Sequence, residues 1–441
     1  RGRRCVAALR GPDRLRTAGG GAKHRLRSVF VTTEIALAVV LLVGAGLMMK
    51  SLLNLLHSNI GFNPENVLTM TVAVPPSKYD DGTKQVAFYE RLKERVNSLP
   101  GVSGSGSVDV LPLQGGNTTR FYVDGDPVPP PGQEIEANSR VVNETYFQTL
   151  GVPIVAGRAF DERDGEVQRQ AAQEQARAQA QARERGQSLP PVPIPGVVII
   201  GKTLADKVFA GRDPVGRRLA YNSFPGQTDL VIGVVGDVKI GGLDEAIRPV
   251  IYYPFRRFPG VGTNLVVRTN GDPTALAAAI RNETRAVEPD VAVFNMRPMD
   301  EVIGNSPAAF MRRFPALLIG IFAGVALLLA SIGIYGVVSY SVSQQTHYIG
   351  VRMALGAQAS DILKMVLKQG LALALAGMAL GALASLALMR LLQSLLFEVQ
   401  PTDTTTFAVV LGTLLVVALL ACYIPARRAT KVDPLVALRY E

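Results

Sequence analysis

The sequence predicts an α-helical membrane protein with four transmembrane helices and a large α+β extracytoplasmic domain, which combines a split β-α-β unit with an inserted β-rich subdomain. Three observations lead to this fold class. The chain has four long apolar segments, basic residues gather on one side of these segments, and strand and helix patterns occupy the chain between the first and the second apolar segment. Of the 441 residues, 48% are hydrophobic and only 19% are charged, and the mean hydropathy is +0.22. This composition is too apolar for an ordinary soluble protein and indicates a membrane protein.

Four segments are long and apolar enough to cross the hydrocarbon core of a bilayer, which takes about 20 helical residues. They are predicted at about residues 29–56, 314–341, 370–396 and 405–424. These helices leave a basic segment or linker at 1–28 and a long segment at 57–313. The C-terminal membrane region, 314–441, holds the last three helices.

The net charge of +10 would suit a nucleic-acid partner, but the basic residues gather in short segments on one side of the predicted helices. Those before the first helix are Arg1, Arg3, Arg4, Arg10, Arg14, Arg16, Lys23, Arg25 and Arg27. Those after the last helix are Arg427, Arg428, Lys431 and Arg439. This positive-inside pattern predicts a multi-pass protein of the plasma (inner) membrane with both termini in the cytoplasm and no nucleic-acid partner. Because the chain starts at Arg1 without an initiator Met, we also expect a fragment of a longer protein.

The long segment 57–313 is then extracytoplasmic, and its two ends repeat one pattern. Residues 57–116 and 256–310 each show a strand-like run, a run with helical apolar spacing and a second strand-like run. Two such units predict a split β-α-β sandwich with both helices on one face of a single sheet. Residues 117–255 form the predicted β-rich insertion, since Gly and Pro turns separate short runs such as "DLVIGVVGDVKI".

Within the insertion, "EVQRQAAQEQARAQAQARERGQ" has low complexity and lacks large apolar residues. Such a stretch has too little apolar surface to join a core. We expect it to be exposed, either as a solvated helix or as a disordered spacer.

The stretch "PGVVIIGKT" matches the G-x-x-x-x-G-K-[ST] spacing of a phosphate-binding loop through Gly196, Gly201, Lys202 and Thr203. A second run ends at Asp237, as a magnesium-binding strand would. However, the residues between the glycines are Val and Ile, which favour an extended strand and resist the tight turn that phosphate binding needs. The stretch also lies on the predicted outer side of the membrane. We therefore expect a strand here and no nucleotide cofactor.

Catalytic and metal-binding patterns are not found in the sequence. The three histidines, His24, His57 and His347, lie far apart and have no neighbours at ligand spacing. Neither G-x-S-x-G nor H-E-x-x-H occurs. We expect no catalytic residues, no metal and no cofactor.

Two further features belong to the membrane region. Gly320 with Gly324, and Gly377 with Gly381, have the spacing that allows helices to approach closely in lipid. The loop after the second helix predicts a short amphipathic helix at about 345–357, followed by a helix that runs into the third transmembrane segment. The short helix either lies along the membrane interface or docks into a groove of a partner protein.

Several stretches resemble MacB/FtsX-type permeases of ABC transporters. "ASIGIYGVVSYSVSQQTHYIGVRMALGA" is similar to the FtsX-like transmembrane domain. "GFNPENVLTMTVAVP", "VNETYFQTLGVPIVAGRAFDERD", "DPVGRRL" and "VIGVVGDVKIGGLDEAIRPVIYYPF" resemble the MacB-like extracytoplasmic core. The resemblance covers nearly the whole chain from about Arg27. The basic head and the first helix also resemble the second half of duplicated permeases, in which one chain carries two such units.

The resemblance implies a coupling helix, between the second and third transmembrane helices, that contacts a separate ABC ATPase subunit. Carried onto this chain, the coupling residues are Gln345, Tyr348, Ile349, Gly350, Val351, Arg352, Met353, Ala354, Leu355 and Gly356. The family pattern R-T-x-E-I-G-I-R has Arg and Glu where this chain has Gln345 and Tyr348. From the apolar spacing we expect Ile349 to be an anchor in the ATPase groove.

These features together predict the transmembrane permease subunit of an ABC-type exporter or mechanotransmission complex. ATP hydrolysis by the separate ATPase would move the extracytoplasmic domain, and a second permease unit would complete the assembly as a homodimer or a fused pseudo-dimer. The alternative is a non-transporting FtsX-like regulator of a cell-envelope enzyme.

Overall fold

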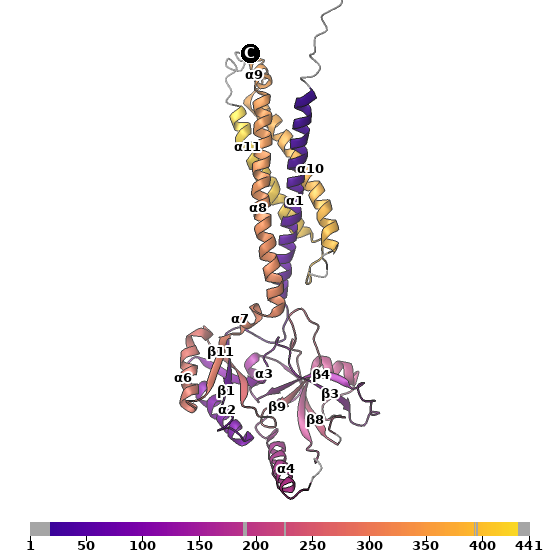
Figure 1. Cartoon of the computed structure of the whole chain (residues 1–441), viewed down its shortest axis with the longest axis vertical. Helices are drawn as coiled ribbons and strands as arrows, with labels where there is room; N and C mark the ends of the chain where they lie inside the picture. The colour runs from indigo at the N-terminus through magenta and orange to yellow at the C-terminus, as the bar shows by residue number, and fades with distance from the viewer. Residues whose placement is uncertain (1–17, 188–191, 225, 392, 394–395, 431–441) are drawn as a thin grey trace, which may run out of the picture. The chain divides into compact units, whose positions relative to one another are not determined.

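The structure is a computed structural model that describes residues 18–187, 192–224, 226–391, 393 and 396–430. The first part of the predicted basic head, residues 1–17, and the basic residues Lys431 and Arg439 lie outside the described residues. The chain divides into two compact units (Figure 1), one from Leu56 to Phe310 and the other formed by the segments on either side of it.

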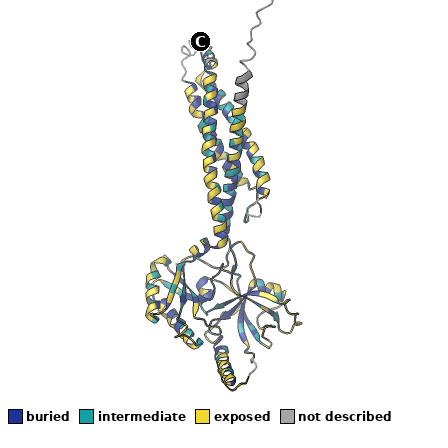
Figure 2. Ribbon diagram, in the orientation of Figure 1, coloured by how far each residue is buried: buried dark blue, intermediate teal, exposed yellow. Residues whose placement is uncertain are grey.

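Among its described residues, the membrane unit contains four helices that are long and apolar enough to span a bilayer, which confirms the predicted number of spans. They are α1 (Ala18–Leu56), α8 (Pro307–Gln344), α10 (Ala359–Leu391) and α11 (Thr404–Ala429). In the most apolar stretch of α1, 50% of the residues are buried within the structure, compared with 22–28% in the corresponding stretches of the other three helices. The other three helices therefore pack around α1 and keep apolar faces exposed (Figure 2), as a lipid environment requires.

The two predicted glycine pairs differ in their surroundings. A Cβ added at Gly377 would lie 2.7 Å from Cβ of Ile35, and one at Gly381 would lie 2.6 Å from Cβ of Val39. This pair thus allows α10 to pack closely on α1, as predicted. At Gly320 and Gly324 of α8, an added Cβ would meet no described atom within 4 Å, so the packing predicted for that pair does not occur within this chain.

The second unit begins and ends with the elements of the split β-α-β sandwich, which confirms the predicted fold class. These elements are β1 (Val67–Ala73), α2 (Gly82–Asn97), β2 (Val102–Val108), β10 (Gly262–Thr269), α6 (Ala277–Val287) and β11 (Ala292–Pro298). The strands form an antiparallel sheet in the order β11-β1-β10-β2. Phe88 and Leu92 of α2 share one core with Ile280 of α6 and with the sheet, so both helices cover the same face. The sheet continues into the insertion through a single pair, Val108 with Val142.

The inserted subdomain contains a closed β-barrel, a feature that the sequence did not predict. Its strands are β3 (Thr118–Val123), β4 (Ile135–Val142), β6 (Gly196–Gly201), β7 (Arg218–Ala220), β8 (Thr228–Val235) and β9 (Val250–Pro254). The pairings run β3-β7-β8-β6-β9, and β9 then pairs with β4 and β4 with β3, which closes the ring. A short strand, β5 (Ile154–Gly157), pairs with β8 outside the ring, and α3 (Tyr146–Leu150) follows β4.

The phosphate-loop match folds as strand β6 followed by α5 (Lys202–Phe209), so the expected strand is confirmed. Lys202 forms an ion pair with Asp206 (2.5 Å) on the same helix. Asp237 accepts hydrogen bonds from the backbone N–H (2.7 Å) and the hydroxyl (2.8 Å) of Thr203. The two parts of the apparent nucleotide motif therefore bind each other and fix the start of α5.

The low-complexity stretch forms a helix, α4 (Glu166–Glu184), whose surface is mostly exposed. Its first turns are attached to the start of α2. Arg169 is buried and donates a hydrogen bond to the Thr83 hydroxyl (2.5 Å), and Gln173 donates one to Asp81 (2.5 Å). Of the two predicted alternatives, the solvated helix is correct.

Candidate functional site: the loop helix of the membrane unit

The predicted coupling segment forms α9 (Thr346–Ala354), between α8 and α10. The helix ends earlier than the expected residue 357, because Gly356 adopts φ +99°, a left-handed conformation that favours glycine. The Gly356 N–H donates to the carbonyl of Met353 (3.1 Å), and the Ala357 N–H donates to that of Arg352 (3.0 Å). These bonds satisfy the last carbonyls of α9 and turn the chain into α10.

One face of α9 packs within the chain itself. The Ile349 side chain is fully buried and contacts Ile362 of α10 and Ala429 of α11 in a small apolar core, with Met353 at its edge. Gly350 is also buried. The expectation that Ile349 is an anchor in a partner's groove is therefore wrong. Helical spacing identifies a face that will be buried, but does not say which molecule buries it.

Another face of α9 is exposed and carries Tyr348 and Arg352, and Leu355 follows directly after the helix, so the three stand at i, i+4 and i+7. The Tyr348 side chain is 50% exposed and that of Leu355 is 83% exposed. The guanidinium carbon of Arg352 lies 4.6 Å from the centroid of the Tyr348 ring, a cation–π arrangement. Arg352 also approaches Sδ of Met365 at 3.6 Å. We call these three residues the exposed face of α9.

The other predicted coupling residues lie before α9 or at its sides. Gln345 precedes the helix, and its amide nitrogen lies 3.4 Å from the Ser341 hydroxyl. Val351 and Met353 are half-buried at the sides of the helix. The side chain of Ala354 lies outside the described residues. The described side chains present an aromatic ring, a guanidinium and an apolar group at the surface, which suits a contact surface.

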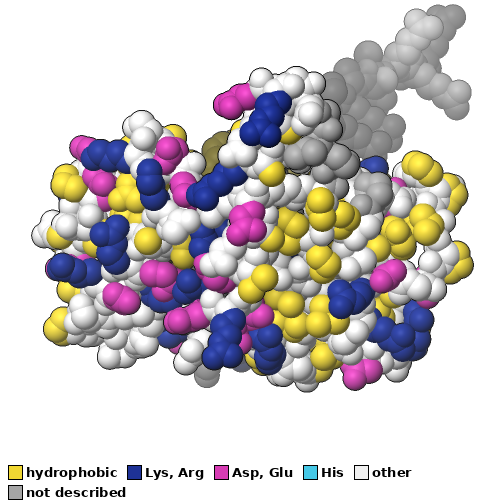
Figure 3. Space-filling view, turned by 90° about the horizontal axis from the view of Figure 1, so that it is seen from below, with side chains coloured by type: hydrophobic (Ala, Val, Ile, Leu, Met, Phe, Trp, Pro, Cys, Tyr) yellow, Lys and Arg dark blue, Asp and Glu magenta, His cyan; other side chains and the backbone are white. Residues whose placement is uncertain are grey.

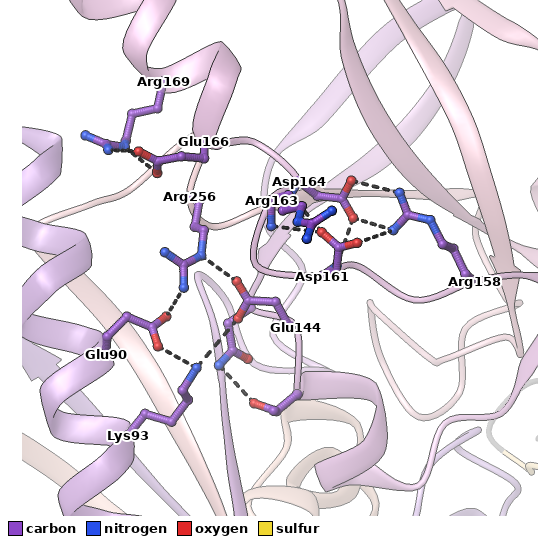
Figure 4. Close-up of polar contacts among 12 residues, drawn as sticks. Glu90, Lys93, Glu144, Arg158, Asp161, Arg163, Asp164, Glu166, Arg169 and Arg256 are labelled. Atoms are coloured by element: carbon purple, nitrogen blue, oxygen red, sulfur yellow. Dashed lines mark hydrogen bonds and ion pairs between the residues drawn. The ribbon is translucent and has the colours of Figure 1, made fainter.

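In the extracytoplasmic unit, one group of charged contacts links α2 to the segment after β9 (Figure 4). Arg256, after β9, binds Glu144 (2.9 Å) and Glu90 of α2 (3.1 Å), and Lys93 of α2 binds Glu90 (2.5 Å). Burial lowers the pKa of Arg256, but the hydrogen bond from Arg256 to Glu144 and the charges of Glu144, Glu90 and Glu162 together raise it overall. Because α2 belongs to the open sheet and Arg256 to the barrel side, this network braces the two parts against each other.

Nearby, Asp164 accepts two hydrogen bonds from the guanidinium of Arg158, at 2.5 and 2.9 Å. These bonds raise the pKa of Arg158 and fix the loop that precedes α4. On the face shown in Figure 3, acidic and basic side chains are interspersed, and hydrophobic side chains lie mainly in its right-hand part. The part of the chain that the structure describes holds no group of His, Cys, Asp and Glu suited to a metal ion.

Comparison with known proteins gives family matches in both units. Residues 29–283, more than half of the chain, match the family described as the MacB-like periplasmic core domain. Residues 320–434 match the FtsX-like permease C-terminal family. The second match includes α9.

The chain is also similar to named exporters. It is 24% identical over 435 residues to the macrolide export ATP-binding/permease protein MacB of Bartonella quintana, covering 94% of this chain and 57% of that protein. It is 29% identical over 254 residues to the MacB of Azoarcus sp., covering 56% and 38%, and 27% identical over 254 residues to the pyoverdine export protein PvdT of Pseudomonas aeruginosa, covering 55% and 37%. The chain thus spans about half the length of the curated relatives that it matches.

Among solved structures, the periplasmic region of MacB from Actinobacillus actinomycetemcomitans is similar over 57% of this chain and 98% of that one, with 14% identity and a TM-score of 0.34. The two family matches follow each other along the chain. The first includes most of α1 and most of the domain that follows it, and the second includes α10, α11 and most of α8. The chain belongs to the MacB/FtsX-type family of transporter permeases, and is a multi-pass inner-membrane protein with an α+β extracytoplasmic domain.

Proposed function

We propose that this chain is the transmembrane permease subunit of an ABC-type exporter or mechanotransmission complex. In this proposal a separate ABC ATPase binds the exposed face of α9, and its cycle of ATP binding and hydrolysis moves the membrane helices and through them the extracytoplasmic domain. Support comes from the family matches and from the names of the relatives, which are export ATP-binding/permease proteins. The nucleotide is bound by the ATPase and not by the Gly196–Gly201 strand.

The observation that carries the proposal is the division of α9 into two faces. Ile349 fixes the helix to α10 and α11, so a force applied to α9 is passed directly to both helices. Leu355, exposed by 83%, and the Tyr348–Arg352 pair remain available to a partner. Tyrosine and arginine, the two residue types of this pair, are enriched in interface hot spots.

The topology of the proposal places both chain termini and α9 in the cytoplasm, following the positive-inside pattern. Single cysteines test it with a membrane-impermeant thiol reagent on intact cells. Cysteines at Gln187 and Gly271, both exposed positions of the extracytoplasmic unit, should be labelled from outside, and a cysteine at the exposed Gln358 should not. Labelling of Gln358 from outside would contradict the topology.

A second permease unit, either another copy or a fused half, completes the proposed assembly. The face of α8 that carries Gly320 and Gly324 is the candidate contact, because these glycines meet no described atom within 4 Å. Pairs of small residues at this spacing let two helices approach closely in lipid.

Copurification tests the ATPase contact. The tagged chain, expressed in its own host, should bring down an ABC ATPase, and Leu355→Asp should reduce its yield about tenfold, the effect of losing one central apolar contact. Leu391→Asp is the matched control, because Leu391 is also exposed (80%) but lies at the opposite end of α10. If no ATPase accompanies the parent chain, the proposed function is wrong. If Leu355→Asp retains the ATPase as well as Leu391→Asp does, the contact lies elsewhere.

The regulator alternative uses the same ATPase contact but a different output. It predicts that deleting the chain lowers the activity of a cell-envelope enzyme and leaves the export of compounds unchanged. The exporter predicts the reverse, so the two measurements on one deletion strain separate them.

A further inference from the structure

The barrel of the extracytoplasmic unit is closed at one end and open at the other. At the closed end, apolar side chains from successive strands fill the interior, among them Phe121, Val198 and Ile251. Helix α5 leaves β6 at this end and adds Leu204 and Phe209 to the same core. Side chains two residues further along a strand point to the same side. The interior can therefore be followed strand by strand toward the other end.

At the other end the inward positions become polar. The side chain of Thr119 points to the same side of the sheet as that of Phe121, two residues along the strand. The same relation holds for Asp229 and Val231, for Tyr221 and Leu219, and for Tyr253 and Ile251. Together with residues from the adjoining loops, they line a pocket of about 300 Å³. The mouths of β-barrels are common ligand sites, and this volume is at the lower end of the range for small-molecule pockets.

The floor of this pocket is rigid and carries no net charge. Asp229, which is 1% exposed, binds the Arg257 guanidinium (2.7 Å) and accepts a hydrogen bond from the Tyr221 hydroxyl (2.8 Å). The Tyr221 and Tyr253 hydroxyls lie 3.1 Å apart. Gly196 makes room for the ion pair, because a Cβ there would lie 2.1 Å from Nη1 of Arg257. The charge of Asp229 is already compensated, and Arg257 is not available to an anionic ligand.

The described residues of the wall and the rim of the pocket, unlike those of its floor, include a carboxylate outside any ion pair and exposed aromatic rings. Asp109, just after β2, also lines the pocket, and its Oδ1 accepts the backbone N–H groups of Val110 (2.9 Å) and Val141 (3.0 Å). Among the described residues no base lies within ion-pair distance of it. Desolvation raises its pKa, although both hydrogen bonds and the charge of the buried Arg140 oppose the rise. Phe224 (68% exposed) and Phe258 (47% exposed) stand at the rim, and one face of Phe258 is covered by Arg257 at 4.7 Å.

We infer that the open mouth of this barrel binds a small organic cation, a protonated amine that carries an aromatic or apolar body. The ammonium group would form a direct ion pair with Asp109, and the body would lie against Phe224 and Phe258. A desolvated carboxylate with no base at ion-pair distance among the described residues, beside exposed aromatic rings, favours a cation over a neutral or anionic ligand of the same shape. The inference is independent of the proposed ATPase contact, since it concerns only the extracytoplasmic unit.

Two probes of almost equal shape test the inference: 2-(1-naphthyl)ethylamine, which is protonated at neutral pH, and the uncharged 2-(1-naphthyl)ethanol. Their binding to the full chain in nanodiscs of zwitterionic lipid is measured by calorimetry, with empty nanodiscs subtracted to remove partitioning into lipid. We expect the amine to bind at least about tenfold more tightly than the alcohol, because a desolvated charge pair separates the two.

Two substitutions locate the binding. Asp109→Asn keeps an oxygen for the Val110 and Val141 amides and removes the charge, so it should weaken amine binding about tenfold and leave alcohol binding unchanged. Phe224→Ala should weaken both probes about threefold or more. The controls are Asp213→Asn, whose carboxylate also accepts a backbone N–H (Val215, 3.0 Å), and Phe294→Ala, an exposed Phe (48%) of β11. Both controls lie outside the pocket and should change neither affinity.

Three results would overturn the inference: no binding of the amine to the parent chain at millimolar concentration, equal affinities for amine and alcohol, or loss of binding in the controls to the same extent as in the pocket variants. A thermal unfolding curve for each variant shows whether it is folded. If Asp109→Asn is destabilised, Phe224→Ala decides alone, because the Phe224 side chain is exposed and its removal leaves the fold intact.

Discussion

Helices α8 and α10 carry the same G-x-x-x-G spacing but use it differently. In α10, Gly377 and Gly381 lie against Ile35 and Val39 of α1, so closely that no side chain fits between the helices. In α8, Gly320 and Gly324 face no other described part of the chain. A small-residue pair thus predicts close approach, but only the structure shows whether the approaching helix belongs to the same chain.

The same distinction applies to α9. Ile349 and Leu355 are both apolar residues of one short amphipathic segment, yet Ile349 is fully buried against α10 and α11, and Leu355 is 83% exposed. The first residue stabilises the loop, and the second is available to a partner. Substitutions at such paired positions should therefore separate effects on the chain's own stability from effects on its assembly.

The largest effect is expected for Gly381→Leu. The added Cβ would lie 2.6 Å from Cβ of Val39 and 2.7 Å from the carbonyl oxygen of Ala36, and a backbone atom of a packed helix cannot move aside easily. We expect a loss of about 4 kcal/mol or more, or no folded protein. Thermal unfolding in detergent measures it. The control is Gly412→Leu in α11, where an added Cβ meets nothing within 4 Å; equal melting temperatures for the two variants would contradict close packing of α10 on α1.

A smaller but still large effect is expected for Ile349→Asp. The substitution buries an unpaired carboxylate in the core formed with Ile362 and Ala429, at a cost of roughly 3 kcal/mol. Leu355→Asp introduces the same side chain at an exposed position and should leave stability within about 0.5 kcal/mol. Limited proteolysis of the loop, together with the melting temperature, compares them. Should both variants resist protease equally, the packing of α9 on α10 and α11 would be wrong.

The sequence predicted the membrane helices and the split β-α-β unit because both depend on patterns within one segment. Four apolar runs of sufficient length, and two strand-helix-strand units, can be recognised without knowing what they contact. The closed barrel depends on pairings between distant segments, such as β4 with β9, where Asn138 lies opposite Val250. Neither strand contains a signal for its partner, so the insertion could be predicted as β-rich but not as a barrel.

The candidate site on α9 could likewise be predicted only where it depends on patterns within one segment. The spacing of Ile349 and Met353 located α9 and its buried face. The helix ends earlier than expected, at the Gly356 turn, and the partner of the buried face could not be predicted. The aromatic contact of Arg352 with Tyr348 was also missed, although the i, i+4 spacing of the two residues was a signal for it. The pocket at the barrel mouth combines residues from β3, β4, β8 and β9 and from the adjoining loops, and no local pattern brings these together.

An intermediate effect, confined to assembly, is expected for Gly320→Leu. Since nothing lies within 4 Å of an added Cβ, the stability of the chain should change by less than about 0.5 kcal/mol. If a second permease unit packs on this face, self-association in liposomes, measured by energy transfer between labelled copies, should weaken about tenfold. Gly412→Leu again serves as control. Unchanged association would show that this face of α8 contacts lipid and that the second unit binds elsewhere.

The smallest effect is expected for Tyr348→Glu, which brings the family's Glu into the exposed face of α9. The change replaces the cation–π contact with Arg352 by an ion pair at i, i+4, with the acid on the N-terminal side, where such pairs are most favourable. Both interactions are exposed and worth a few tenths of a kcal/mol, so the stability of the chain should hardly change. Any larger consequence must therefore come from the ATPase.

Copurification of the ATPase with Tyr348→Glu, Tyr348→Ala and Arg352→Ala, and with the two double variants, gives the coupling energy between the two positions. If Tyr348 acts by orienting Arg352, both Tyr348 variants lose their effect once Arg352 is removed, and Tyr348→Glu alone retains the ATPase better than Tyr348→Ala. If Tyr348 contacts the ATPase directly, its substitution weakens binding by the same factor whether or not Arg352 is present. Binding that all five variants retain at the parent's level would exclude this face of α9 as the coupling surface.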